Sequence, residues 1–423
     1  MKLKFKAPEK RASATKLSAA VDNFNGALDQ VNEVLVERES EVNALKLCLI
    51  AQEHIMLQGE PGIAKSMFAR EVFQRIQGFR MFKKQFTSTT QPDEVLGCMD
   101  SKVYREQAVW KYNIKGMLPD AHGAFLDEVY RAAKSFLSNL MQILNERTFF
   151  NGTEEVECPL VTAIGTTNFT LHDDELEAFR DRWLVNLNTK RLSGMDPRLT
   201  VFERFLISEN GKVSTKDGSV KTVTFEELKM IQDAATSVPI SRAVLEAFDG
   251  LFRTYLNYQK NSKISDRRLC QILKLFQAAF ILSNPKEGEA MSEEVLVHAQ
   301  MGFCSVGDEA QNEHFNQAFE KVVGERLKDR AMVVKLQKLQ KHVKGMEVHY
   351  DSNMSPKVAK TVYVESLRYL DAIKAYDKSV LRAENQRILL DCGRRLECLV
   401  NDVRGIVSKS IQEEVEDSVD LDD

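Results

Sequence analysis

The stretch from Glu53 to Glu71, EHIMLQGEPGIAKSMFARE, constrains the fold more strongly than any other part of the sequence. An apolar run at Ile55–Leu57 is short enough for a buried strand, and the loop after it contains two glycines and a proline. Helix-forming residues follow from Lys65 onward. A strand, a glycine-rich loop and a helix in this order are the context of a phosphate-binding loop. Glycines let backbone N–H groups approach phosphate closely, and the N-terminus of the new helix adds a positive dipole.

Two side chains of this loop carry the chemistry that a nucleotide requires. Lys65 would neutralise the outer phosphates, and the hydroxyl of Ser66 would bind Mg²⁺. One position departs from the pattern G-x-x-x-x-G-K-S/T, because Ala64 stands in place of the second glycine. We expect Ala64 to adopt the backbone angles of a helix start, which alanine tolerates. The predicted nucleotide-binding residues of the loop are Gly59, Glu60, Pro61, Gly62, Ile63, Ala64, Lys65, Ser66 and Met67.

The composition excludes several classes of protein. The chain has 423 residues, enough for two or three domains, and its net charge of −4 gives no overall attraction to nucleic acid. Its seven cysteines are scattered without C-x-x-C pairs, which is typical of reduced thiols and not of a disulfide framework or a zinc site. No signal peptide and no run of about 18 apolar residues is apparent. We therefore expect a cytoplasmic protein without a membrane segment.

Further apolar segments predict a sheet around the loop. The predicted strands lie at 81–89, 124–126, 160–168 and 183–188, with helical patterns between them. Short apolar strands that alternate with helices are typical of a parallel, doubly wound α/β fold. In such sheets a ligand binds at the carboxyl ends of the strands. Lys65, Asp127 and Asn168 each follow a predicted strand end, so we expect these side chains to converge.

Two adjacent carboxylates follow the strand at 124–126. Asp127 would hold Mg²⁺ together with Ser66, and Glu128 would polarise the attacking water. Asn168, at the end of the next strand, would orient that water. The alternative interpretation is ordinary acidic residues at the start of a surface helix, and a turn or helix cap for Asn168.

Three arginines are further candidates. Arg182 follows a short helix predicted at 174–182 and could act on a nucleotide held by a neighbouring subunit, a contribution of about 10³–10⁵ in rate where it operates. Arg267 and Arg268 begin a helix of a second domain, and either could reach back over the phosphates. The alternatives are a surface salt bridge for Arg182 and a solvated helix face for Arg267 and Arg268.

The pattern of helices and loops divides the chain into six parts. We predict a mobile segment at 1–20, an α/β core at 21–190, a connector at 191–224, an all-α lid at 225–310, a helical C-terminal domain at 311–410 and an acidic tail at 411–423. Two insertions interrupt the core. The first, at 90–121, is predicted to hold a short helix and a hairpin, and the second is a hairpin at 148–158 with its turn at Asn151–Gly152.

Five motifs taken together resemble the AAA+ ATPases of the MoxR group. They are GEPGIAKS, PDEVLG, LPDAHGAFLDE, LNERTFFNG and TTN, within residues 22–300. The RavA subgroup is the most similar, because its phosphate loop also reads Ala-Lys-Ser. The resemblance implies an AAA+ P-loop core, an all-helical lid and ring-shaped hexamers. It does not extend clearly beyond residue 310, where no strand-rich stretch is apparent.

The resemblance also implies a role for each candidate residue. Gly59–Ser66 would be the Walker A loop, and Asp127 and Glu128 the Walker B pair. Asn168 would be sensor 1, Arg182 the arginine finger and Arg267 sensor 2. Adenine would lie near Val34–Arg38.

We predict a Mg-ATP-dependent ATPase that hydrolyses ATP between subunits and uses lid motion to remodel or chaperone a protein client. Members of the MoxR group often act with a partner that has a von Willebrand factor A domain, and such a partner would be a separate protein here. Two alternatives remain open. One is a DNA-associated remodeller that grips a strand with its inserted hairpins, and the other is an ATP-gated assembly scaffold with little turnover.

Overall fold

The computed structural model describes residues 14–168, 179, 181–207, 219–260, 264–304, 308–324, 356–374 and 383–419. The chain folds into two compact units, Met1–Phe319 and Glu320–Asp423. Most of the helix predicted at 174–182, part of the predicted connector and part of the predicted helical C-terminal domain lie outside the described residues.

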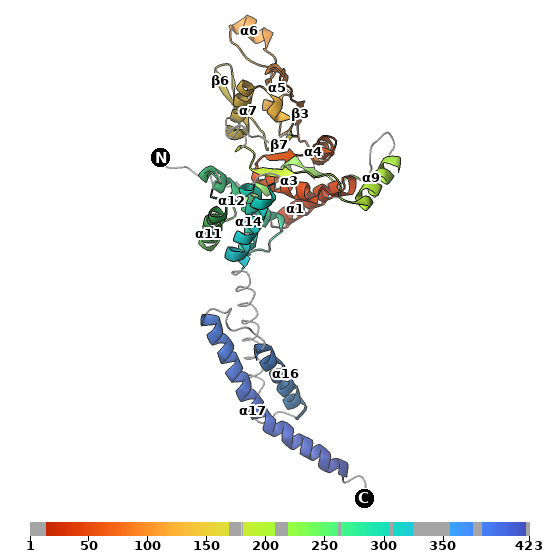
Figure 1. The fold of residues 1–423 in the computed structure, drawn as a ribbon, viewed down its shortest axis with the longest axis vertical. Helices are drawn as coiled ribbons and strands as arrows, with labels where there is room; N and C mark the ends of the chain where they lie inside the picture. The colour runs from red at the N-terminus through yellow and green to blue at the C-terminus, as the bar shows by residue number, and fades with distance from the viewer. Residues whose placement is uncertain are drawn as a thin grey trace. The chain divides into compact units, whose positions relative to one another are not determined.

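The first unit is built on a five-stranded sheet in the order β3-β4-β7-β1-β8 (Figure 1). The strands are β1 (Ile55–Gln58), β3 (Met81–Gln85), β4 (Gly123–Asp127), β7 (Thr162–Thr167) and β8 (Val185–Asn188). Every neighbouring pair in this sheet is parallel. Each strand overlaps a predicted one, and the predicted parallel α/β fold is confirmed. β7 is buried along its whole length, as expected of a central strand covered on both faces.

Helices and short strands complete the first unit. The α-helices are α1 (Ala14–Asp29), α2 (Val31–Val34), α3 (Glu39–Ala51), α4 (Lys65–Phe73), α5 (Asp93–Leu96), α6 (Ser101–Gln107), α7 (Lys134–Glu146), α9 (Met195–Ile207), α10 (Phe225–Thr236), α11 (Arg242–Tyr258), α12 (Asp266–Leu282), α13 (Gln300–Phe303) and α14 (Glu309–Phe319). The 3₁₀ turns are η1 (Leu118–Asp120), η2 (Val129–Arg131) and η5 (Glu293–Ala299). β2 (Ile76–Gln77) pairs in parallel with β9 (Val223–Thr224). α1 begins inside the segment 1–20, for which no helix is predicted.

The lid helices begin where the sequence supplies a side-chain cap. The hydroxyl of Thr224 accepts from the N–H of Glu227 and starts α10, and the Glu227 carboxylate accepts from the Thr224 N–H in return. Ser241 and Ser265 cap α11 and α12 through their hydroxyls. Each cap satisfies a backbone donor that the first turn of a helix leaves without an intrahelical partner.

The two insertions of the core contact each other. β5 (Thr148–Asn151) and β6 (Glu154–Glu157) form the predicted hairpin. The Asn151 side chain accepts from the N–H of Tyr112 at 2.7 Å and donates to its carbonyl at 3.2 Å. In the first insertion the predicted hairpin is reduced to one bridge between Met99 and Tyr112, because the Asp100 carboxylate caps a helix, α6, between them.

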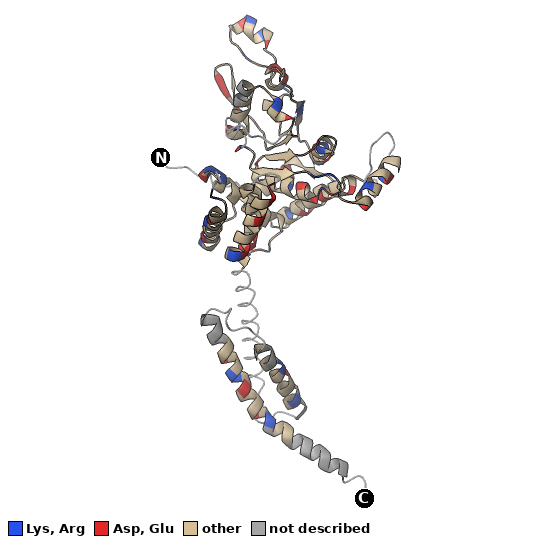
Figure 2. Cartoon of the chain, in the orientation of Figure 1, with Lys and Arg blue, Asp and Glu red and all other residues tan. Residues whose placement is uncertain are grey.

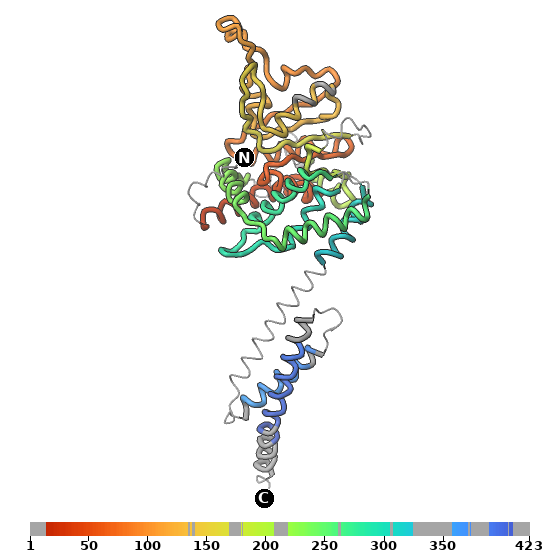
Figure 3. The backbone as a smooth tube through the Cα atoms, turned by 90° about the vertical axis from the view of Figure 1, so that its left-hand side faces the viewer, coloured from red at the N-terminus to blue at the C-terminus, as the bar shows by residue number. Residues whose placement is uncertain are grey.

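The second unit is a helical hairpin. Its helices are α16 (Pro356–Lys374) and α17 (Ala383–Val419), preceded by the π-helical turn η6 (Glu320–Gly324). α16 lies along α17 (Figure 3), and their facing side chains form a core that includes Leu370, Leu396 and Val403. The described residues of this unit contain no strand, and α17 continues into the predicted tail. No helix in the described part of the chain is long and apolar enough to cross a membrane.

We predict that Gly165→Ala destabilises the sheet. A Cβ at Gly165, in β7, would lie 2.7 Å from Met56 Cε and 2.7 Å from Trp183 Cη2. Overpacking of this kind costs about 1–3 kcal/mol. Urea unfolding followed by tryptophan fluorescence would measure the loss. Gly26→Ala in α1 is the matched control, because its Cβ would meet only Lys221 Cδ at 3.9 Å. Equal stability of the two variants would contradict the prediction.

Candidate active site

The glycine-rich loop lies at the carboxyl ends of three strands. β1 ends at Gln58, and its two neighbours hold the start of the loop. The N–H of Gly59 donates to the Thr167 carbonyl at 3.1 Å, and the N–H of Thr189 donates to the Gln58 carbonyl at 2.8 Å. A Cβ at position 59 would lie 2.5 Å from the Thr189 carbonyl oxygen, so this position requires glycine. Gly62 has φ +82°. The loop is therefore closely fitted to the ends of β7 and β8.

Lys65 is the buried cation of the site. Its Nζ donates to the carbonyls of Gly59 at 2.5 Å and Glu60 at 3.1 Å. Burial lowers the pKa of Lys65, while the carboxylates of Glu128 and Asp127 act in the opposite direction. Lys65 thus lies near both predicted carboxylates, in a position where it could exchange the two carbonyls for phosphate oxygens. Such charge-assisted bonds are stronger than those to neutral acceptors.

Ala64 does not adopt the expected backbone angles. It has φ +65° and ψ 21°, in the left-handed region, immediately before α4 begins. The expectation of a helix-start conformation is therefore wrong. An L-residue with a Cβ pays about 1–2 kcal/mol there, whereas glycine does not. The loop keeps the shape that its missing glycine would favour and carries this strain.

The acidic pair is fixed by a residue that the sequence reasoning did not single out. Thr166, fully buried in β7, donates from Oγ1 to Asp127 Oδ1 at 2.5 Å. Thr166 Oγ1 also accepts a hydrogen bond from the N–H of Glu128, at 3.0 Å. Glu128 has φ +54°, and strain of about 1–3 kcal/mol is typical of residues held for function. Thr166 belongs to the TTN motif together with Asn168. Its place in that motif is the sequence signal that could have identified it as a site residue.

The buried oxygens at this edge that have no hydrogen-bond partner among the described residues include Glu128 Oε2 and Asn168 Oδ1. Arg131 Nε lies 3.5 Å from Glu128 Oε2 and forms an ion pair with it. Buried acceptors without donors are costly, and both atoms could accept from one water molecule. Together with the Lys65 ammonium and the half-buried hydroxyl of Ser66, these groups fit a hydrated Mg-nucleotide.

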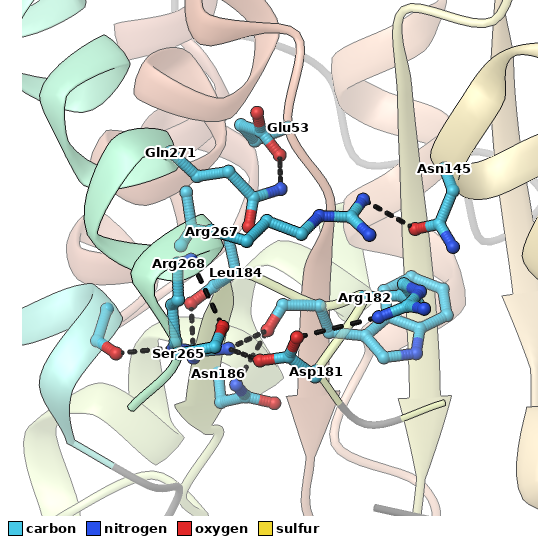
Figure 4. Close-up of polar contacts among 12 residues, drawn as sticks. Glu53, Asn145, Asp181, Arg182, Leu184, Asn186, Ser265, Arg267, Arg268 and Gln271 are labelled. Atoms are coloured by element: carbon cyan, nitrogen blue, oxygen red, sulfur yellow. Dashed lines mark hydrogen bonds and ion pairs between the residues drawn. The ribbon is translucent and has the colours of Figure 1, made fainter. Parts of the chain in front are cut away.

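Arg182 and Arg267 lie at the opposite edge of the sheet. Arg267 Nη2 donates to Asn145 Oδ1 at 2.8 Å, in the last turn of α7. Arg147, two residues after Asn145, donates to the carbonyl of Gln52, which precedes β1. Arg182 stands just ahead of β8. Burial is the main cause that lowers the pKa of Arg182, and the nearby charge of Arg267 lowers it further. Both arginines are therefore close together where the strands begin (Figure 4).

This position differs from the expectation for Arg267. α7 leaves the carboxyl end of β4 and runs back to the other edge of the sheet, and it takes Arg267 away from the phosphate loop of the same chain. The position of Arg268 differs from those of Arg182 and Arg267. It is buried, and its guanidinium donates to the carbonyls of Gly302 at 2.6 Å, Trp183 at 3.3 Å and Leu184 at 2.8 Å. Arg268 therefore joins α12 to the core and does not face a nucleotide.

Asp181 connects these arginines and was not foreseen. Its carboxylate lies 3.5 Å from Arg182 Nη1 and 3.6 Å from Arg268 Nη1. A second joint lies beside it, where Glu53 accepts from Gln271 Nε2 at 2.7 Å (Figure 4). Glu53 also accepts from Lys274 Nζ at 2.7 Å. Arg182 is thus held by a carboxylate that also pairs with Arg268 of the lid.

Comparison with known proteins identifies relatives of the chain. A family model for the MoxR domain in the MoxR-vWA-beta-propeller ternary systems matches residues 22–232. Two uncharacterized proteins of Methanocaldococcus jannaschii, MJ0079 and MJ0812, are 30% and 29% identical; each alignment spans 64% of this chain, and 68% and 69% of those proteins. Chaperone MoxR1 of Mycobacterium tuberculosis is 26% identical over 190 residues, which are 44% of this chain and 49% of MoxR1.

A solved structure shares the fold. The crystal structure of a candidate ATPase from Cytophaga hutchinsonii aligns with a TM-score of 0.57, over 73% of this chain and 96% of its own. The two sequences are 19% identical over this alignment, so the likeness concerns the fold alone.

We predict that Ala64→Gly stabilises the protein. Glycine removes the cost of the left-handed angle, so the free energy of unfolding should rise by about 1 kcal/mol. Urea unfolding would measure the gain, and binding of a fluorescent ATP analogue would show that the loop still functions. Ala108→Gly is the matched control, since Ala108 has φ +51° in the first insertion. A neutral or destabilising Ala64→Gly would show that the loop is not strained.

Proposed function

We propose that this chain, which belongs to the MoxR-type AAA+ ATPases, hydrolyses Mg-ATP at its glycine-rich loop. We propose further that it uses the energy to remodel a protein client. The observation that carries the proposal is a buried acceptor, Glu128 Oε2, near the Lys65 ammonium, with a second buried acceptor, Asn168 Oδ1, at the same edge of the sheet. A cation for phosphate and acceptors for a water molecule are the groups that phosphoryl transfer to water requires.

Each residue of the phosphate edge has a proposed task. Backbone N–H groups of the loop and Lys65 bind the phosphates, and Ser66 and Asp127 hold the metal. Thr166 orients Asp127 by its hydrogen bond. Glu128 accepts a proton from the attacking water, and Asn168 orients that water. Bound Mg²⁺ would neutralise charge on the phosphoryl oxygens.

The arginines support a site completed by a second copy. Arg182 and Arg267 lie at the edge where the strands begin, so in a head-to-tail assembly this edge of one copy faces the phosphate edge of the next. Contacts of this kind are heterologous, and they form a ring where the rotation closes. We propose a homo-hexamer with Arg182 as the finger and Arg267 as the sensor acting across the boundary. Assignment to the RavA subgroup remains our prediction.

The relatives guide the proposed partners. MoxR1 is a chaperone, and the matching family is described by systems that include a vWA component. We propose a protein client and a separate partner with a von Willebrand factor A domain, in the cytoplasm. The helical hairpin of α16 and α17 is a candidate site for such a partner.

The DNA-associated alternative is less well supported. The hairpins that would have to grip a strand, at 93–115 and 148–158, carry four basic and seven acidic side chains. β6 is acidic (Figure 2), and Glu154 already pairs with Lys111. A polyanion requires a basic surface, and its binding would weaken steeply with salt. The scaffold alternative does not explain a strained, buried Glu128.

We predict that Glu128→Gln binds ATP but loses turnover, because glutamine keeps the shape and removes the base. Lys65→Ala should lose nucleotide binding itself. Phosphate release and binding of a fluorescent ATP analogue would be measured side by side, with thermal melting to confirm that both variants fold. Normal hydrolysis by Glu128→Gln would refute the catalytic assignment.

We predict that Arg182→Ala lowers turnover by about 10³-fold or more while a single copy still binds nucleotide. Mixing it with Glu128→Gln should restore part of the activity, since some sites then combine an intact glutamate with an intact arginine from the neighbour. Arg242→Ala, at an exposed ion pair of α11, is the control. If the two inactive variants give no activity when mixed, Arg182 does not act between copies.

A further inference from the structure

Helix α9 exposes an apolar face that nothing in the site accounts for. None of its described side chains is buried. Six large apolar residues on it are exposed, at fractions from 38% to 81%: Met195, Leu199, Val201, Phe202, Phe205 and Leu206. Four of them, at 195, 199, 202 and 206, recur at the spacing of one helix face. Exposed apolar patches of this kind mark interaction sites.

Residues 189–194, between β8 and α9, attach α9 to the phosphate loop; this short segment is called the connector below and is not the longer connector predicted at 191–224. The guanidinium of Arg38, itself buried, donates to the carbonyl of Ile63 in the loop at 3.2 Å and to that of Lys190 in the connector at 3.1 Å. The Glu37 carboxylate accepts from the N–H and the hydroxyl of Ser193, at 2.8 and 2.6 Å. One end of α9 is therefore fixed to the phosphate edge.

A second ion pair strengthens this attachment. Arg191 Nη2 pairs with the carboxylate of Glu60, the second residue of the loop. Both side chains are exposed, so the pair by itself contributes little. The pair matters for its position, because it contacts the loop directly at Glu60, whereas at Ile63 the connector is linked to the loop only through Arg38.

We propose that the apolar face of α9 is the docking surface for a second copy of this chain, and that docking fixes the phosphate loop through Arg38. The proposal rests on the proposed function, in which the arginine edge of one copy approaches the phosphate edge of the next. α9 starts at that phosphate edge and lies on the side of the first unit away from α12 (Figure 1). A neighbouring copy whose arginine edge approaches this phosphate edge would therefore come close to α9.

The contacts of Arg38 predict a coupling between assembly and nucleotide affinity. A docked α9 restrains the connector, the connector restrains Ile63 through Arg38, and the loop then holds phosphate in fewer conformations. By linkage, nucleotide must favour docking by the same factor. Wild-type protein should therefore bind nucleotide more tightly at concentrations where it assembles.

The test uses the full-length variants Phe202→Asp and Leu199→Ser. Both residues are exposed, at 58% and 43%, so neither change should disturb the fold, and thermal melting would check this. Phe150→Asp, 56% exposed on β5, is the matched control. Mass photometry with Mg-ATP, phosphate release, and titration with a fluorescent ATP analogue below and above the assembly concentration would be measured for each protein.

We expect Phe202→Asp to remain a single copy where wild type assembles, to lose at least tenfold in turnover, and to bind the analogue with the same affinity at all concentrations. Leu199→Ser should show a weaker form of these effects, and Phe150→Asp should assemble as wild type does. Wild-type assembly by Phe202→Asp would overturn the inference and leave the proposed function standing. So would normal assembly with lost binding of a vWA partner or client, because α9 would then dock that protein. A wild type without assembly or turnover would instead refute the proposed function.

Discussion

The parallel order of the five strands is the constraint on which the site depends. It places every strand's carboxyl end at one edge, so that the loop after β1, Asp127 at the end of β4 and Asn168 after β7 meet without any long-range signal in the sequence. The same order sends the end of α7 and the start of β8 to the other edge, where Arg182 and Arg267 lie. One topological fact thus separates the groups that bind phosphate from the arginines that would complete the site.

Sequence reasoning succeeded where chemistry follows a strand directly. The runs at Ile55–Leu57 and Ala124–Leu126 are short, apolar and followed at once by a glycine loop or two carboxylates, so strand position and site position could be predicted together. For these residues, the position of each strand and the rule that ligands bind at the carboxyl ends of parallel strands were enough for the prediction. The structure shows Ser and Thr caps at the starts of α10, α11 and α12, a signal that the prediction of an all-α lid did not use.

It failed where the partner of a side chain is a backbone group or a distant element. The Arg268 guanidinium bonds three carbonyls, which carry no signature in a sequence, so its choice over Arg267 as the structural residue could not be foreseen. Ala64 adopts a left-handed backbone angle that alanine does not itself favour, so its residue type could not predict that angle. α9 was not predicted, because residues 191–224 were assigned to a connector; its large apolar side chains are exposed among the described residues.

The joints between lid and sheet bear on how force would pass through the molecule. Arg268 and Glu53 hold α12, and Gln232 donates to the Leu49 carbonyl at 2.7 Å, so the lid is tied at several well-separated points. A body tied in this way resists bending as one lever. In an assembly of the proposed kind the compliant hinge would then be the seam between copies, and the stroke would be delivered by whole subunits tilting against each other.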